Sequence, residues 1–480
     1  MADGVPRRPQ YSLPSEYGPT RPPEDAIDTD PAVRTLPRDG AEPEPEPTLS
    51  RRERRTVEEN ERSEQRAREA RARWVRRGVA ILVVIGLIPA GWSYVHALQR
   101  PGTDSFGIRT VEWVRDHGGN GIVNTVERWW YTNNPPAAGG RPGQIQVQGT
   151  GGDVAVSLRP PASVTPVSTA PPVPAHLPPP MRRVPTPAPN VQENEGIWMP
   201  AGRLVGGQPP EYITFVRPDP VHTSYYVAIM WLDTRLLRAA YVPGLLEPGS
   251  GPNPWGAQIP PGERNTLIAA FNSGFKMNSA RGGVYFGGQE VRPLVDGSAS
   301  LVIRSDGSAT VGMWGRDVTM STDVTAVRQN LALLIDNGEL DPALNETDTT
   351  KWGATLGNKA LVWRSGVGID ANGALIYAGG NSLSVLSLAR TLRNAGAVRA
   401  MELDINSSWV SAYTYVNNPP EDPNAPVIGI KLGGDMSRGG DRYLQPGERD
   451  FFAFFADPKF PQLITTTTTT TARKTTTTRK

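Results

Sequence analysis

The longest uninterrupted run of apolar residues spans residues 78–98, which include no Asp, Glu, Lys or Arg. A helix of this length crosses about 30 Å of hydrocarbon, the thickness of a bilayer core. Trp92 and Tyr94 stand near its end, where aromatic side chains favour the membrane interface. Because 77 residues precede the run, it does not have the position of a cleaved signal peptide, and a buried core helix is the other interpretation. The pattern predicts one transmembrane helix.

Positive charge is distributed unevenly on the two sides of this helix. Residues 51–77 carry eleven Arg against six Glu, whereas Arg100 is the only early positive charge after the helix. The positive-inside rule then predicts a single-pass plasma-membrane protein with a cytoplasmic N-terminus and residues 99–480 extracytoplasmic. The Arg-rich run serves as an orientation signal and a contact for anionic lipid, so we expect no nucleic-acid partner. Its helix-forming residues would also allow a charged helix there.

Both ends of the chain are poor in apolar residues. Residues 1–50 hold ten acidic residues, five Arg and many Pro, so residues 1–77 are interpreted as a disordered cytoplasmic tail that is Arg-rich at its end. Residues 464–480 form a Thr-rich basic segment, which composition also predicts to be disordered.

Two further segments separate the membrane helix from the rest of the chain. Residues 99–158 are predicted to be a juxtamembrane helical region, with two short amphipathic helices within 103–131 and a polar strand candidate at 144–158. Residues 160–189 contain twelve Pro, which predicts a semi-rigid spacer over residues 159–195.

Residues 196–463 are long enough to form one sizeable core. Short apolar runs alternate there with Gly, Asn and Asp, a pattern typical of strands joined by tight turns, as at Asp306-Gly307 and Asn372-Gly373. Only 325–337 and 382–395 have the length and periodicity expected of helices. The predicted fold is therefore α+β: a strand-rich mixed domain with a few helices, preceded by a single transmembrane helix and disordered segments. The predicted strands are 212–216, 225–231, 265–271, 284–286, 300–303, 310–313, 360–363, 374–377, 400–403, 409–415 and 451–455.

Composition narrows the chemistry. The chain has no Cys, which excludes disulfides, thiol nucleophiles and Cys-ligated metals, and its four His are scattered along the sequence. No metal site or cofactor is identified, although carboxylates alone could hold Mg²⁺ or Ca²⁺. Of the 50 basic residues, 43 are Arg, and this bias together with the exported arrangement indicates a bacterial protein.

Two candidate motifs place polar residues at the ends of apolar strands. In 269–276 the strand ends at Asn272, Gly274 permits close backbone approach, and Lys276 adds a cation. In 361–370 Arg364 interrupts an apolar strand, where a charge needs a partner or a cleft, and its planar guanidinium suits a carboxylate or phosphate. An ordinary strand-to-turn transition is the other interpretation of the first motif, and Asp370 is expected only to initiate a hairpin turn.

The third motif, 400–409, contains Glu402 and Asp404 two positions apart, so both point to one face of a strand. Two carboxylates on one side of a cleft are what glycosyl transfer needs. The polar turn that follows contains Asn406 and Ser407. A solvated strand face, with Asp404 capping its turn, is the alternative.

Together the three motifs resemble the phosphodiester glycosidase family, whose N-acetylglucosamine-1-phosphodiester alpha-N-acetylglucosaminidase members remove N-acetylglucosamine from a sugar-1-phosphodiester. The resemblance lies in the segments 271–275, 364–370 and 403–408, in their order and spacing, and in the helix before the third, over about residues 210–457. Two departures narrow the space around the backbone: Ile405-Asn406-Ser407 stands where the family has three Gly, and Ser273 replaces the first turn Gly.

The resemblance implies a hydrolase that cleaves the C1–O bond of a sugar-1-phosphodiester in a cell-envelope glycan or phosphopolymer. It implies Asp404 as nucleophile or base and Glu402 as a second carboxylate. Arg364 and Lys276 would hold the phosphate. The remaining expected substrate-binding residues are Asn272, Gly274, Asn406 and Ser407.

Two alternatives remain open at the level of sequence. A non-catalytic glycan-binding module on a membrane tether is favoured by the altered turns. Metal-dependent cleavage on the phosphate side is disfavoured because His222 is the only His in residues 196–463.

Overall fold

The computed structural model describes residues 50–134, 136–142, 176–345, 350–352, 361–419, 422 and 424–460. The tail at 1–49, the strand candidate at 144–158 and the Thr-rich segment at 464–480 lie outside these residues. The chain divides into two compact units, Met1–Val84 and Ile85–Lys480, and the boundary falls within the first helix.

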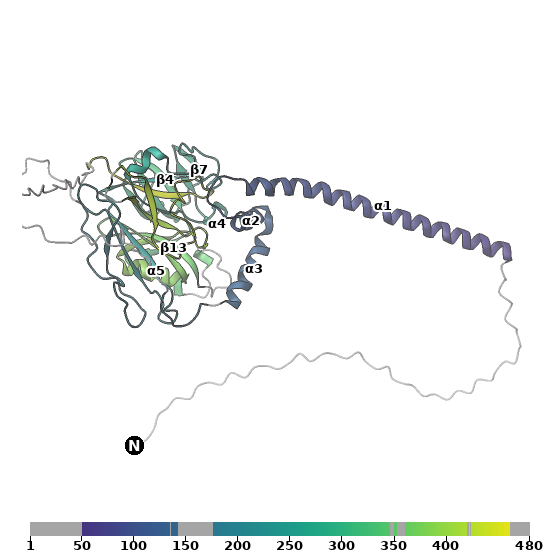
Figure 1. Cartoon of the computed structure of the whole chain (residues 1–480), viewed down its shortest axis with the longest axis horizontal. Helices are drawn as coiled ribbons and strands as arrows, with labels where there is room; N and C mark the ends of the chain where they lie inside the picture. The colour runs from purple at the N-terminus through teal and green to yellow at the C-terminus, as the bar shows by residue number, and fades with distance from the viewer. Residues whose placement is uncertain are drawn as a thin grey trace, which may run out of the picture. The chain divides into compact units, whose positions relative to one another are not determined.

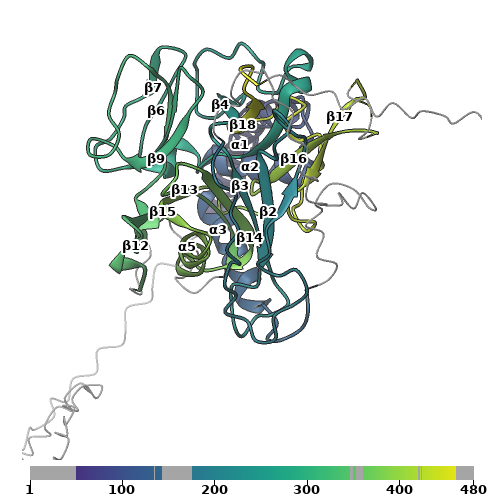
Figure 2. The ribbon, with the colours of Figure 1, turned by 90° about the vertical axis from the view of Figure 1, so that its left-hand side faces the viewer.

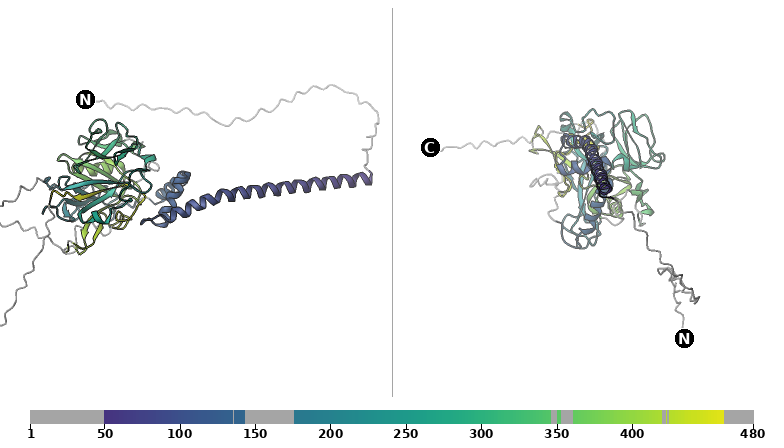
Figure 3. Two further views of the ribbon diagram at one scale, coloured as in Figure 1. Left: turned by 90° about the horizontal axis from the view of Figure 1, so that it is seen from above. Right: turned by 90° about the vertical axis from the view of Figure 1, so that its right-hand side faces the viewer.

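That helix, α1 (Arg51–Leu98), is continuous through its internal Pro89 (Figure 3). It is long and apolar enough to cross a membrane, and the apolar window is not buried inside the protein. A Pro is tolerated in such helices because local adjustments satisfy the freed carbonyl. The structure corrects one boundary: residues 51–77 form a charged helix rather than a disordered segment, because Ala, Arg and Glu favour helix.

The two predicted juxtamembrane helices are confirmed as α2 (Phe106–Val114) and α3 (Asn120–Asn133). The turn η1 (Arg115–Gly119) joins them, and Gly118 adopts a φ of 85° there, which side chains disfavour. Ser105 caps α2 by accepting a hydrogen bond from the Ile108 amide.

The described residues of the unit Ile85–Lys480 that follow α3 form a strand-rich head, teal to yellow in Figure 1. The head contains three antiparallel sheets. The eight-stranded sheet has the order β1 (Met199–Ala201), β2 (Glu211–Val216), β3 (Val227–Leu232), β14 (Leu375–Leu383), β13 (Val362–Asp370), β15 (Ala397–Glu402), β11 (Leu333–Asp336) and β12 (Glu339–Leu340). One five-stranded sheet has the order β7 (Gln289–Arg292), β6 (Val284–Phe286), β10 (Val324–Gln329), β8 (Ala299–Arg304) and β9 (Ala309–Met313). The other has the order β17 (Val427–Lys431), β16 (Ala412–Asn417), β5 (Leu267–Asn272), β18 (Phe451–Ala456) and β4 (Leu237–Val242).

The α+β prediction is confirmed, since few helices accompany these sheets. The described helices of the head are α4 (Met277–Ala280), α5 (Val385–Asn394), η2 (Pro261–Thr266), η3 (Pro342–Asn345) and η4 (Thr350–Trp352). Each predicted strand overlaps an observed strand, and the two predicted hairpin turns connect β8 to β9 and β13 to β14. The helix predicted at 382–395 is confirmed as α5, which a Ser384–Ser387 capping box begins.

The helix predicted at 325–337 is wrong. This segment forms β10 and β11, which belong to different sheets. Leu331 adopts a φ of 57° between them, a left-handed conformation that ends one strand and redirects the chain toward the next.

The eight-stranded sheet has packed side chains on both faces. On one face α5 lies against β13, β14 and β15 (Figure 2). A Cβ at Gly366 would lie 3.0 Å from Leu392 Cδ1, so the glycine permits this close approach. On the other face Tyr377 stacks on Phe271 of the neighbouring sheet, with ring centroids 4.9 Å apart. The main core therefore lies between sheets, and its edge is where the candidate site forms.

The described part of the predicted spacer, residues 176–195, packs on the head instead of extending away from it. Leu177 and Val184 are buried in the core cluster beside β3 and α5. Glu195 is fully buried and pairs with Arg217 at 3.0 Å. Apolar residues between the prolines thus attach this part of the segment to the domain.

Candidate active site

Two segments far apart in sequence meet where β5 ends and β18 begins. Phe451 pairs with Asn272 across the antiparallel ladder, so residues just before β18 lie beside those just after β5. The loop after β15 joins them through Ser365 of β13, whose hydroxyl accepts from the Asn272 side-chain amide at 3.0 Å and donates to the Asp404 carbonyl at 2.8 Å. These loops line a void that is too narrow to admit a water molecule. Its lining residues are Asn272, Ser273, Gly274, Asp404, Trp409, Arg442, Arg449 and Asp450.

Asp404 is 4 % exposed and fixed at both carboxylate oxygens. The Asn406 amide donates to Oδ1 at 2.9 Å, and Arg449 Nη2 donates to Oδ2 at 2.5 Å. Burial raises the pKa of Asp404 above its usual range, while the Arg449 guanidinium opposes that rise. Asp404 is therefore a more basic carboxylate than an exposed aspartate.

Asp450 is a second carboxylate on the same void. Its Oδ2 accepts hydrogen bonds from Arg328 Nε at 2.7 Å and from the Tyr241 hydroxyl at 2.8 Å, whereas Oδ1 is buried without a hydrogen-bond partner. Burial alone would raise the pKa of Asp450, but the Arg328 and Arg449 guanidinium groups hold it below the usual value. The environments thus shift the pKa values of Asp404 and Asp450 in opposite directions, a pattern found in acid/base pairs.

Asn272 and Gly274, which the sequence predicts to bind substrate, do line the void. Their observed contacts, however, are with neighbouring protein groups that fix the turn. The Asn272 amide group donates to Ser365 Oγ at 3.0 Å, and its carbonyl oxygen accepts from the Tyr377 hydroxyl at 2.9 Å. A Cβ at Gly274 would lie 2.9 Å from the Asn330 side chain, so this position requires glycine. The adjacent Ser273 hydroxyl is buried without a hydrogen-bond partner.

Arg364 and Glu402 are not among the residues that line the void. They form a buried ion pair with 2.5 Å between Nη1 and Oε1, and their side chains are 2 % and 0 % exposed. Arg364 Nε also donates to the Leu383 carbonyl at 2.9 Å. Burial raises the pKa of Glu402, and the Arg364 guanidinium opposes that rise. The structure thus pairs these two predicted site residues with each other.

Lys276 contacts a segment that the sequence did not connect with the site. We call residues 99–119 the juxtamembrane strap. The Lys276 ammonium lies 2.5 Å from Glu112 and 2.7 Å from Asp116 of this strap. Although burial opposes it, the pKa of Lys276 is raised by these carboxylates, with Glu112 the stronger influence. The Lys276 ammonium, which the sequence predicts to bind a phosphate, is therefore already paired with two carboxylates.

Other residues connect the strap to the head. Arg100 pairs with Glu448 at 3.1 Å, and Asp104 lies 2.5 Å from Arg438. A Cβ at Gly102 would lie 2.4 Å from the Pro446 carbonyl oxygen, so the two backbones approach closely. Ion pairs thus attach the strap to the head near both of its ends, and its carboxylates pair with Lys276 and Arg438 of the head.

Asn406 and Ser407 shape the turn after Asp404. The Asn406 carbonyl accepts from the Trp409 amide at 2.8 Å, and its side-chain oxygen accepts from the Ser408 amide at 2.8 Å. The Ser407 carbonyl accepts from the Ser437 hydroxyl at 2.8 Å. Both residues are partly exposed, and Asn406 also orients the catalytic candidate through its amide.

Sequence reasoning missed Arg449, Asp450, Trp409 and Arg442. A signal was present for the first two, because two charges stand directly before the all-apolar strand β18. Such charges need partners once the strand is buried. The positions of Trp409 and Arg442 depend on loop folding, which no local pattern specifies.

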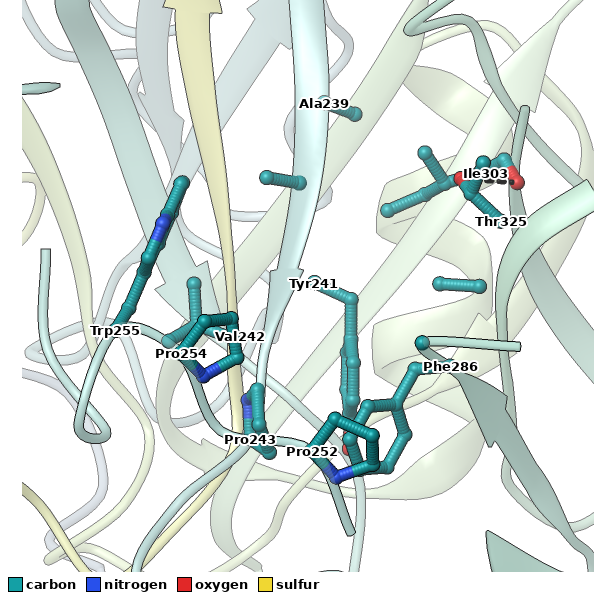
Figure 4. A pocket seen from close by; sticks show the side chains of 13 residues that line it. Ala239, Tyr241, Val242, Pro243, Pro252, Pro254, Trp255, Phe286, Ile303 and Thr325 are labelled. Carbon is teal, nitrogen blue, oxygen red and sulfur yellow. Dashed lines mark hydrogen bonds between the residues drawn. The ribbon is translucent and has the colours of Figure 1, made fainter. Parts of the chain in front are cut away.

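A second, larger pocket of about 320 Å³ has Tyr241 in its lining (Figure 4). Its lining is mainly apolar and includes Trp255 and Phe286, the latter with its ring centroid 5.3 Å from that of Tyr241. Tyr241 connects the two cavities, since its hydroxyl bonds Asp450. Among the residues that the structure describes, no group of three or more His, Asp or Glu is placed to hold a metal ion.

No protein-family model matches the chain, and no curated protein matches it. Among solved structures, it is distantly similar to the catalytic domain of zebrafish N-acetylglucosamine-1-phosphodiester alpha-N-acetylglucosaminidase, which that structure shows auto-inhibited by its pro-peptide. This match has 15 % identity and a TM-score of 0.31, over 51 % of this chain and 82 % of that one. A hypothetical protein from Synechocystis matches with 13 % identity and a TM-score of 0.26, over 48 % of this chain and 59 % of the other. The chain thus spans less than two thirds of the Synechocystis protein.

Proposed function

We propose that the chain is a membrane-anchored, extracytoplasmic bacterial hydrolase that cleaves the glycosidic C1–O bond of a sugar-1-phosphodiester in a cell-envelope glycan or phosphopolymer. The observation that carries the proposal is the pair of buried carboxylates, Asp404 and Asp450, on one polar void. The three motifs resembling the phosphodiester glycosidase family support the same reaction.

The chemistry requires little acid catalysis. When the C1–O bond breaks, its electron pair stays on the phosphate oxygen and a phosphate monoester leaves as an anion, which is stable near neutral pH. Water supplies the new C1–OH group and loses a proton. The protein must therefore position the phosphate, stabilise positive charge at C1 and activate the nucleophile.

We assign these tasks to groups that line the void and to Lys276, which does not line it but follows Gly274 by two residues. Asp404 is the nucleophile or base, since its raised pKa makes it the more basic carboxylate. Asp450 stays ionised and stabilises positive charge at C1 through its unpartnered Oδ1. Lys276 and Arg449 hold the phosphate, and Arg449 takes the role first expected for Arg364. The Ser273 hydroxyl is available for the sugar.

Substrate entry requires movement, because the void admits no water molecule and strap carboxylates pair with Lys276. The residues that must move are those of the strap around Glu112. A phosphate that replaces Glu112 at Lys276 would keep the cation paired throughout, so the exchange leaves no buried charge uncompensated.

Arg449→Gln is expected to move the acidic limb of the kcat/KM profile to higher pH. Asp404 must be ionised to act, and an adjacent opposite charge lowers a carboxylate pKa by about 1–3 units. Removing the guanidinium raises the pKa of Asp404 further, so activity appears only at higher pH. Arg449→Lys keeps the positive charge and should leave the limb nearly in place. An unchanged limb in a folded Arg449→Gln protein would show that a different group titrates.

The proposal is tested with the full chain in uncharged detergent micelles and a panel of synthetic sugar-1-phosphodiesters. We expect free sugar and a phosphate monoester to be released together. Binding without release would instead support a non-catalytic glycan-binding module on a membrane tether, which the closed void also favours. Protease accessibility of the two ends in sealed vesicles tests the proposed orientation, in which only the N-terminal tail is cytoplasmic.

A further inference from the structure

We propose that Arg438, Arg442 and Trp409 form a second anion-binding subsite beside the void, which accepts a phosphate group and which Asp104 of the strap occupies in this structure. The inference deepens the proposed function, on which it rests for the identity of the substrate. It adds that the ligand carries a second negative charge, apart from the one at Lys276 and Arg449.

Three arginine side chains surround the buried indole ring of Trp409. The guanidinium carbons of Arg438, Arg442 and Arg449 lie 4.9, 5.0 and 5.2 Å from the centroid of the Trp409 ring. Trp409 is 2 % exposed, and the three arginines are between 3 % and 6 % exposed. Like charges this close and this buried repel one another unless anions accompany them.

The structure supplies little negative charge there. Arg449 has Asp404 as its partner, whereas Arg438 and Arg442 share Asp104, at 2.5 and 3.8 Å. One carboxylate thus serves two buried guanidinium groups. An anion with more oxygens, such as a phosphate, would match this pair better because each arginine could receive its own acceptor.

Buried donors without a hydrogen-bond partner also favour an anionic ligand such as a phosphate. Trp409 Nε1, Arg442 Nε and Arg438 Nη2 are all buried without a hydrogen-bond partner. The Asp104 oxygen that approaches Arg438 at 2.5 Å also lacks hydrogen-bond geometry. Buried donors are almost always satisfied in folded proteins, so several unsatisfied donors in one place indicate a site built for a different acceptor.

The position of Asp104 limits where the ligand comes from. Asp104 follows the end of α1 at Leu98 by only six residues, so the subsite lies near the membrane-proximal end of the strap. Arg109 fixes this stretch by donating to the carbonyls of Leu98 at 2.7 Å and of Gly102 at 2.9 Å. A phosphodiester of a soluble polymer and the headgroup of an anionic lipid share the required chemistry.

The test measures binding of bis(glycerol) phosphate, a phosphodiester without a glycosidic bond, to the full chain in uncharged micelles. We expect Asp104→Asn to tighten binding at least ~10-fold because it removes the internal anion. Arg438→Gln and Arg442→Gln should each weaken binding at least ~10-fold. A merely structural Asp104 predicts the opposite for Asp104→Asn: a lower Tm with unchanged or weaker binding.

A second arm compares micelles that contain phosphatidylglycerol with micelles that contain phosphatidylcholine. An Arg438-dependent competition between phosphatidylglycerol and the soluble probe identifies a lipid headgroup as the source. Binding of the probe that phosphatidylglycerol leaves unchanged identifies a soluble phosphodiester. Both results support the subsite.

Matched controls make the same changes in the partly exposed pair Arg304–Asp323, which is 2.8 Å apart and outside the void. Arg304→Gln and Asp323→Asn should not change binding. If folded Arg438→Gln and Arg442→Gln proteins bind the probe as tightly as the parent chain, the subsite is disproved. Because the probe contains no sugar, this result is independent of whether the chain hydrolyses any glycoside.

Discussion

Replacing Asp404 with Asn is expected to lower turnover of a sugar-1-phosphodiester at least ~100-fold, the usual scale for the loss of an acid/base group. Asn keeps the shape of the side chain and one oxygen for the Asn406 amide, so the turn is preserved. It cannot act as a nucleophile or accept a proton at neutral pH. The measurement is kcat on the substrate identified by the release assay.

The same substitution leaves Arg449 without its charged partner, and a buried unpaired charge destabilises a fold. Tm is therefore measured alongside, and kcat is compared well below the lower Tm. Asp370→Asn is the matched control, because Asp370 accepts hydrogen bonds from the Asn372 and Ala374 amides in a hairpin turn away from the void. Its turnover should stay near that of the parent chain. Near-normal turnover in folded Asp404→Asn would remove Asp404 from the mechanism.

Local sequence pattern predicts most of the central strands because they are apolar runs bounded by turn residues. It misses β1, β4, β7, β12 and β17, all of which lie at the edges of their sheets. It also predicts α5, where a capping box and an apolar face agree. It fails for β10 and β11 because β10 is buried on nearly all of its length and so lacks the alternation of a half-buried strand. Pairing with β6, β8 and β15, which are distant in sequence, decides their structure.

The candidate site likewise contains residues that local sequence pattern predicts and residues that only long-range pairing brings there. Asp404 and the turn at Asn272 are recognisable because each follows an apolar strand directly. Asp450 joins them only through the pairing of β18 with β5, a contact that sequence spacing does not reveal. Arg364 illustrates a different limit: a charge within an apolar strand has the same local pattern whether its partner is a substrate or Glu402. Only the fold distinguishes these two cases.

The Arg364–Glu402 pair is expected to stabilise the fold without taking part in turnover. Arg364→Met removes the partner of a fully buried carboxylate, so we expect the free energy of unfolding to fall by about 3–5 kcal/mol. Glu402→Gln should cost a similar amount because it leaves a buried guanidinium uncompensated. The double variant should be more stable than the sum of the two single losses predicts, since it leaves neither charge buried alone.

Denaturant unfolding of the four proteins measures this coupling, and Arg304→Met with Asp323→Asn provides a partly exposed pair for comparison. That pair should contribute little to the free energy of unfolding because solvent screens it. kcat of the folded Arg364→Met protein separates the two roles of the arginine. Structural pairing predicts a kcat near that of the parent chain at temperatures below the lowered Tm. A large loss of kcat without a loss of stability would return Arg364 to the phosphate site that its sequence context first indicated.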